Sequence, residues 1–186
     1  SPGDKVNILF NKKDWLEFVD LYVCTLSNLL RYQKDNPEQS YKLIYEGMYH
    51  ASRVLFSFTD DSRTIMACLR ALEVGSEYLL QAFNRYSIST FMDILSNKDS
   101  LFIHSANTAV ISIIIAFNTY LPSKLSDKFL FRLVLASLVH DIGKKFIPAS
   151  ILNKHDKLSD KERAVVMQHS LKGALFLAQK KFFHLA

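Results

Sequence analysis

The fold is decided by residues 126–144, SDKFLFRLVLASLVHDIGK. Ser126 is a typical N-cap residue, and apolar side chains then recur at three- and four-residue steps through the rest of the stretch. We predict a helix that begins after Ser126 and runs to Lys144 or Lys145, because Pro148 prevents its continuation. So few polar residues lie along it that we expect this helix to be central and buried.

Helical periodicity continues on both sides of this stretch. It predicts helices over residues 38–58, 62–85, 87–97 and 100–119, and similar apolar steps mark residues 15–30. The segment from Ser159 to Glu162 has the sequence of a capping box, and we expect it to open a helix that carries His169. Five Gly and four Pro are too few for a β-sandwich with frequent tight turns. The predicted fold class is therefore all-α.

A polar break at residues 97–99, Asn-Lys-Asp, divides the chain into two predicted domains, a helical N-terminal domain at 1–96 and a second helical domain at 97–186. Residues 1–100 hold 11 Lys and Arg against 13 Asp and Glu, whereas residues 101–186 hold 12 against 5, a net charge of +7. A basic half attracts phosphate-bearing ligands. Its Lys residues are scattered, without the aromatic clustering of single-strand binders, so we expect a phosphate pocket and no stable nucleic-acid partner.

The composition, with 49% hydrophobic and 22% charged residues, is typical of a soluble globular protein. The longest apolar run, residues 110–117, is interrupted by Ser112 and is too short to span a bilayer, so we expect no membrane span. Cys24 and Cys68 each lie in an apolar helical stretch and are expected to be buried reduced thiols, with a disulfide or metal role as the alternative. Reduced thiols favour a cytoplasmic location.

Two ionisable residues, His140 and Asp141, interrupt the apolar stretch. An ionised Asp in such a helix is costly unless a cation or hydrogen bonds neutralise it. Lys144 follows one turn later, so a helix would place all three side chains on one face. Taken alone, the trio also fits a structural pairing of Asp141 with Lys144, with His140 capping a neighbour.

Two further histidines favour chemistry over structure. His104 lies on the predicted helix before the central one, and His169 on the predicted helix after it. If these helices are antiparallel neighbours, three imidazoles converge on Asp141. Imidazole and carboxylate together suit Fe, Mn, Zn or similar ions, and a carboxylate can bridge two of them. Such ions activate water toward phosphorus, and Lys144 would steady the phosphate oxygens.

This order of residues resembles the HD-GYP branch of the HD superfamily over roughly residues 97–180. The resemblance rests on His140-Asp141-Ile-Gly-Lys144, on Ile-Pro-x-x-Ile-Leu-x-Lys at 147–154, on Leu158 and Glu162, and on His104, His169 and Gly173. Members of this branch are mostly cyclic di-GMP phosphodiesterases with a two- or three-metal centre in a helical bundle. The resemblance therefore implies a partial HD-type bundle that hydrolyses cyclic di-GMP with metal-activated water, preceded by a helical partner or sensing domain at 1–96.

The resemblance also implies a role for each site residue. By position, His104, His140 and Asp141 would hold one divalent metal ion. Asp141 would bridge to a second ion held by His169, and Lys144 would contact the scissile phosphate. Members with three metals have a Glu four residues before the first His. Here that position is Ser100, so two ions of Fe, Mn or a similar metal are expected.

The family pattern continues past the point at which this chain stops, with a His-His pair, a Gly-Tyr-Pro loop and a further Asp ligand. We expect the chain to be a fragment of a longer protein that supplies them. The alternative is a catalytically inactive HD-type binding or signalling module. An HD phosphohydrolase acting on other nucleotides is disfavoured, because the residues after Gly143 follow the HD-GYP pattern.

Other candidate residues are interpreted more plainly. His50 has no His-Asp partner nearby and is expected to be a surface or core histidine. His155 lies in a polar loop, where a solvated position is expected and contact with the rim of a substrate site is the alternative. The aromatic residues at positions 10, 15, 18 and 22 have helical spacing, which predicts core packing or a homodimer interface.

Overall fold

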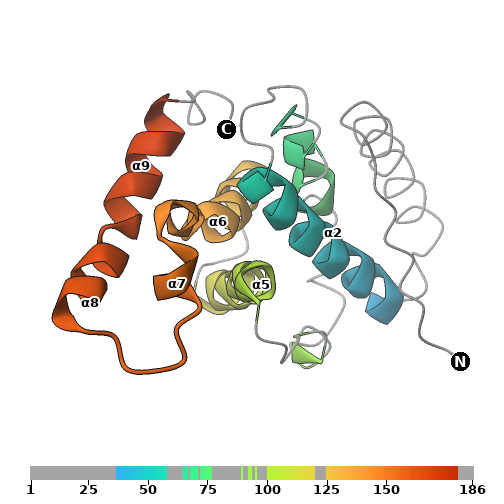
Figure 1. Cartoon of the computed structure of the whole chain (residues 1–186). Coiled ribbons are helices and arrows are strands. Elements are labelled where there is room, and N and C mark those ends of the chain that lie inside the picture. Colours follow the sequence, from blue (N-terminus) through green and yellow to red (C-terminus); the bar gives the residue numbers. More distant parts are fainter. Residues whose placement is uncertain are drawn as a thin grey trace, which may run out of the picture.

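The structure, a computed structural model, describes residues 37–57, 65–66, 68–70, 72–76, 89, 92–93, 95, 100–119 and 125–179. Every regular element in these ranges is helical (Figure 1): α2 (Pro37–Ser57), α5 (Leu101–Thr119), α6 (Asp127–Val139), the 3-10 helix η2 (Ile142–Phe146), α7 (Ala149–Leu152), α8 (Asp160–Met167) and α9 (His169–Gln179). The all-α prediction is confirmed, as are the helices expected at 38–58 and 100–119. The described parts of 65–76 are helical too, whereas residues 15–30 and the four early aromatic residues lie outside the described ranges.

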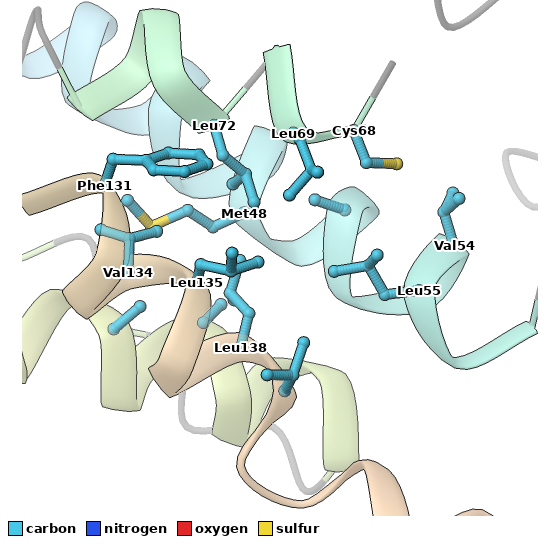
Figure 2. Close-up of a cluster of buried hydrophobic side chains, with 14 of the residues drawn as sticks. Met48, Val54, Leu55, Cys68, Leu69, Leu72, Phe131, Val134, Leu135 and Leu138 are labelled. Carbon is cyan, nitrogen blue, oxygen red and sulfur yellow. The ribbon is translucent and has the colours of Figure 1, made fainter. Parts of the chain in front are cut away.

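Helices α2, α5 and α6 pack on one another and enclose the hydrophobic core. Figure 2 shows Met48 and Leu55 of α2 facing Val134 and Leu138 of α6. Leu130, Val134 and Leu138 have no exposed surface, so the central helix is buried as predicted. Each such side chain contributes about 1.5–3 kcal/mol when it is fully buried. The core draws side chains from both sides of residue 97, and the division of the chain into two domains at that point stays a prediction.

Helix α6 begins as predicted but ends earlier. The Ser126 hydroxyl accepts a hydrogen bond from the Phe129 amide at 3.2 Å, which makes Ser126 the N-cap. The prediction that this helix continues to Lys144 or Lys145 is wrong, because α6 ends at Val139 and the chain tightens into η2. In η2 the Lys144 amide bonds the Asp141 carbonyl three residues back, at 2.8 Å. The backbone of η2, wound more tightly than an α-helix, lies against α9. The helical spacing of apolar residues does not predict this contact.

The capping box is confirmed, but the helix it opens is shorter than expected. Ser159 and Glu162 bond each other's backbone amides in the reciprocal manner of that motif. Helix α8 ends at Met167, so His169 does not continue it and is instead the first residue of α9. His169 therefore lies at the start of α9, the helix that packs against η2.

One described helix, α5, is long and apolar enough to cross a membrane, with a mean hydropathy of 1.6. Length and composition alone give this result, and helices of soluble cores meet the same criteria. One face of α5 is buried against α2 and α6, including Ala109, Val110 and Ile113. The arrangement is consistent with the predicted absence of a membrane span. Cys68 is a buried free thiol, as expected, whereas Cys24 lies outside the described residues.

Candidate metal centre

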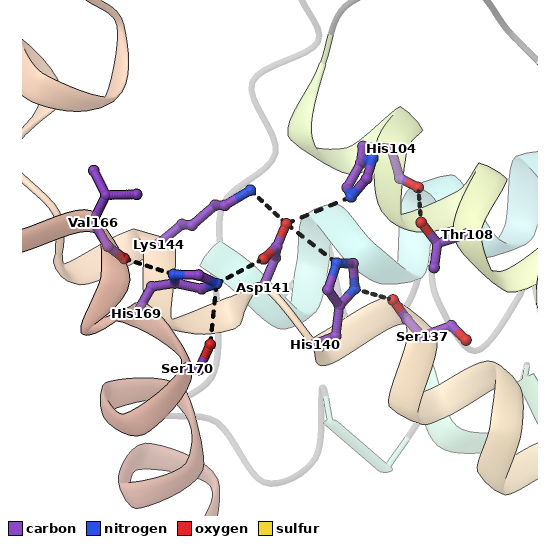
Figure 3. Close-up of polar contacts among 9 residues, drawn as sticks. All are labelled: His104, Thr108, Ser137, His140, Asp141, Lys144, Val166, His169 and Ser170. Atoms are coloured by element: carbon purple, nitrogen blue, oxygen red, sulfur yellow. Dashed lines mark hydrogen bonds and ion pairs between the residues drawn. The ribbon is translucent and has the colours of Figure 1, made fainter. Parts of the chain in front are cut away.

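Asp141 is the centre of the site, and all four partners predicted from the sequence contact it (Figure 3). His104 comes from the first turn of α5, His140 from the end of α6, Lys144 from η2 and His169 from the start of α9. The Oδ2 atom of Asp141 lies 3.3 Å from Nε2 of His140, 3.6 Å from Nε2 of His104 and 2.5 Å from Nζ of Lys144. The other carboxylate oxygen, Oδ1, lies 3.2 Å from Nε2 of His169.

The Asp141 carboxylate is buried among positive and hydrogen-bonding partners. Its side chain is 6% exposed, against 56% for His104. Burial raises the pKa of Asp141, but the hydrogen bond from Lys144 and the charges of His140, Lys144 and His169 outweigh burial and hold the pKa below its usual value. The carboxylate is therefore ionised at neutral pH, which is the state that binds a metal ion.

Backbone carbonyls fix the tautomers of two histidines. Nδ1 of His140 lies 2.7 Å from the carbonyl oxygen of Ser137, and Nδ1 of His169 lies 2.6 Å from that of Val166. Because a carbonyl only accepts, each Nδ1 carries a hydrogen, and the Nε2 of the neutral ring then carries a lone pair. Ligating histidines are held in this way by a second hydrogen bond.

These tautomers leave lone pairs facing the carboxylate. With neutral rings, Nε2 of His140 and Oδ2 of Asp141 are both acceptors, and so are Nε2 of His169 and Oδ1. Such contacts are favourable only with a proton or another cation between the atoms. Ligand atoms of His104, His140 and Asp141 all lie within 4.8 Å of one another, so this group can hold a metal ion. The donor set of imidazole nitrogen and carboxylate oxygen fits Zn, Mn or Fe.

Two glycines bring His169 to the site. A Cβ atom built on Gly143 would lie 1.8 Å from the carbonyl oxygen of His169 and 2.7 Å from the amide nitrogen of Gly173. Only a residue without a side chain allows η2 and α9 to approach backbone to backbone. The sequence pattern contains both glycines, but their spacing gives no indication that they meet.

Similarity to known proteins agrees with this geometry. The family model described as "HD domain" matches residues 89–186, more than half of the chain. The chain belongs to the HD-domain family. Over 82 residues, 44% of this chain, it is 35% identical to a protein of Pseudomonas aeruginosa named "Cyclic di-GMP phosphodiesterase PA4108". The match spans 19% of that relative's length, about a fifth. No solved structure matches the chain. Family and relative together support a metal-dependent phosphohydrolase.

A pocket of about 680 Å³ lies beside the Asp141 site. His104 and Lys144, which both contact Asp141, form part of its lining, and residues 152–155 form another part. His155, expected to be solvated with a substrate rim as the alternative, is both exposed and part of this lining. His50 is an exposed residue of α2 whose ring contacts Tyr49, as expected of a surface histidine.

An ion pair that the sequence did not indicate holds the pocket loop of the HD domain. Nζ of Lys154 donates to both carboxylate oxygens of Glu162, at 2.9 and 2.8 Å. The same carboxylate accepts from the amide and hydroxyl of Ser159. The Lys154 bond and the two Ser159 bonds lower the pKa of Glu162 to about 2. The loop between α7 and α8 is thereby closed on itself beside the site.

Proposed function

We propose that this chain is part of a metal-dependent phosphodiesterase of the HD-GYP type that hydrolyses cyclic di-GMP. The observation that carries the proposal is the position of Asp141, with an imidazole Nε2 facing each of its two carboxylate oxygens. The HD-domain family and the named relative support the reaction class, and the Ile-Pro-x-x-Ile-Leu-x-Lys pattern at 147–154 supports the branch.

The proposed site uses two divalent ions, Fe, Mn or similar. His104, His140 and Oδ2 of Asp141 would hold one, and His169 with Oδ1 would contribute to holding the other. Bound divalent ions lower the pKa of water to near neutrality and polarise phosphoryl oxygens. The protein keeps the carboxylate ionised, fixes two of the rings through the carbonyls of Ser137 and Val166, and leaves one side of the cluster open to the pocket.

Lys144 is the proposed contact to the scissile phosphate. Its Nζ bonds Oδ2 of Asp141, and the residue also lines the pocket. The ammonium group of Lys144 would compete with a divalent cation for this same oxygen. We propose that Lys144 then turns from Asp141 to a phosphate oxygen in the pocket, where an ammonium group stabilises developing negative charge.

The test combines metal analysis with product analysis on the full-length protein. Purified protein, supplemented with Mn or Fe under reducing conditions, is analysed for bound metal and incubated with cyclic di-GMP, and products are separated by chromatography. Asp141→Asn removes the ionised carboxylate at nearly constant shape and is expected to abolish metal retention and hydrolysis without loss of helix. Asp127→Asn, at the exposed start of α6, is the matched control and keeps both.

The outcomes separate the alternatives. Absence of both metal and product in the wild type refutes the enzyme hypothesis. Retained metal with tight cyclic di-GMP binding and no product supports the binding or signalling module instead. Full metal retention by Asp141→Asn means that the bridging role assigned to Asp141 is wrong.

A further inference from the structure

The pocket beside Asp141 has two chemically different walls. One is formed by His104 and Lys144, which both contact Asp141. The other is the end of α7 and the residues after it, from Leu152 to His155. Its volume of about 680 Å³ lies within the range of about 300–1,000 Å³ typical of small-molecule sites. A single phosphate group at the first wall leaves the second wall for another part of the ligand.

The lining is suited to an anion. Among the residues that the structure describes, the lining contains two Lys and two His and no Asp or Glu. Both Lys ammonium groups are bonded to carboxylates outside the lining, Lys144 to Asp141 and Lys154 to Glu162. On the second wall, the side chains of Asn153 and His155 have no hydrogen bond or ion pair within the part of the chain that the structure describes. They are the polar groups of this wall that remain available to a ligand.

The second wall is held in place before any ligand binds. The backbone N–H of Asn153 donates to the carbonyl of Ala149 at 2.9 Å, which holds the backbone of Asn153 against α7. Lys154 is held by both oxygens of Glu162, whose carboxylate also accepts from Ser159. Residues 153 and 155 flank this anchored lysine. The backbone of this wall is therefore held before binding, and the conformational entropy lost there on binding is that of the Asn153 and His155 side chains.

We propose that Asn153 and His155 bind a second phosphate group of the substrate, away from the reacting one. This rests on the proposed function, in which the reacting phosphate lies against His104 and Lys144. The amide and imidazole N–H groups donate to phosphate oxygens. Such a wall selects a ligand with two phosphates, as in a cyclic dinucleotide, over a cyclic mononucleotide with one.

The experiment compares two ligands on four proteins. Binding of hydrolysis-resistant phosphorothioate analogues of cyclic di-GMP and of cyclic GMP is measured by titration calorimetry, in the full-length wild type and in its variants His155→Ala, Asn153→Ala and His50→Ala. His50 is an exposed histidine of α2 outside the pocket lining, so His50→Ala controls for the loss of an imidazole. We expect His155→Ala to weaken the dinucleotide roughly tenfold, the effect of one hydrogen bond to a charged group, and to leave the mononucleotide unchanged. Asn153→Ala gives the same pattern if His155→Ala misfolds.

Each outcome bears on a stated part of the inference. Unchanged dinucleotide affinity in both Asn153→Ala and His155→Ala overturns it, and so does an equal loss for both ligands, which would assign the wall to base or ribose. A wild type that binds no dinucleotide overturns it as well. A wild type that binds the dinucleotide through His155, but forms no product from cyclic di-GMP itself, refutes the proposed hydrolysis and leaves the inference intact.

Discussion

Replacing Gly143 by alanine would push η2 away from α9. The new Cβ would lie 1.8 Å from the carbonyl oxygen of His169, and real Cβ contacts essentially never fall below 3.0 Å, so the two backbones must separate by about 1.2 Å. The opposing atoms are backbone, and no side-chain rotation relieves the clash. Overpacking costs about 1–3 kcal/mol, and a rigid opposing group places this substitution at the upper end. For a chain of this size, 3 kcal/mol lowers Tm by roughly 6–12 °C.

The same shift also reaches the metal centre. His169 is attached to the atoms that must retreat, and Gly173 lies on the same face. Metal–ligand distances in well-formed sites lie within about 0.2 Å of their standard values, so a larger displacement of a ligand weakens binding. We therefore expect Gly143→Ala to lose metal at the His169 side of Asp141 as well as stability, measured by calorimetric titration with Mn²⁺ and by thermal unfolding.

Gly75→Ala is the matched control for this prediction. Its Cβ would meet Cγ2 of Ile44 at 3.6 Å, an ordinary contact, and the residue is helical. Alanine in a helix interior is favoured over glycine by about 0.5–1 kcal/mol, so Tm should hold or rise and Mn²⁺ affinity should stay unchanged. If Gly143→Ala unfolds at the wild-type temperature and binds Mn²⁺ as tightly, the backbone contact does not position His169.

Three further predictions concern single side chains. Lys144→Met should keep or increase Mn²⁺ affinity, because it removes the ammonium that competes at Oδ2 of Asp141, while phosphate affinity falls; weaker Mn²⁺ binding in calorimetry would contradict this. The depressed pKa of Glu162 means that its stabilising contribution is complete above about pH 4.5 and is lost as pH falls toward 2; carboxyl NMR titration should give a pKa near 2, rising toward 4.5 in Lys154→Met. Burial raises the pKa of Cys68 to about 12, so in a Cys24→Ser background a thiol reagent at pH 8 should react with Cys68 only on unfolding, and rapid labelling of this folded variant would refute the burial of Cys68.

The site residues could be predicted because His, Asp and Lys side chains are rare in an apolar helical stretch and are the types that bind metal and phosphate. An ionised Asp in an apolar stretch needs a cationic or hydrogen-bonding partner wherever the helix ends, so the sequence predicts that His104, His140 and His169 gather at Asp141, as their contacts show. The start of α6 was also predictable, since Ser126 bonds an amide three residues away. The N-cap depends on local sequence alone, and the site depends on a few ionisable side chains in otherwise apolar surroundings.

The features that the sequence did not predict depend on contacts between distant backbones. The sequence predicts too late an end for α6, because the backbone of η2 lies against α9 where Gly143 meets Gly173, a contact between residues thirty positions apart. The orientation of the loop with His155 depends on the ion pair between Lys154 and Glu162. The sequence does not predict this pair, because a Lys and a Glu on the surface can each be solvated instead. Hydrophobic periodicity predicts which face of a helix is buried. It does not predict which segments distant in sequence come into contact.

The sparse burial of α8 and α9 has a consequence for how the domain opens. Helix α8 has no buried residue and α9 has only Gly173 and Leu177. The attachments of α9 include the His169–Asp141 contact, the close approach of Gly143 and Gly173, and the ring contact of Phe176 with Phe146. A metal ion held by Asp141 and His169 would reinforce the first of these. Local opening follows the weakest attachment. Amide hydrogen exchange in α9 should therefore slow as metal is added. A metal ion bound at Asp141 and His169 would then also stabilise the attachment of α9 to the rest of the domain.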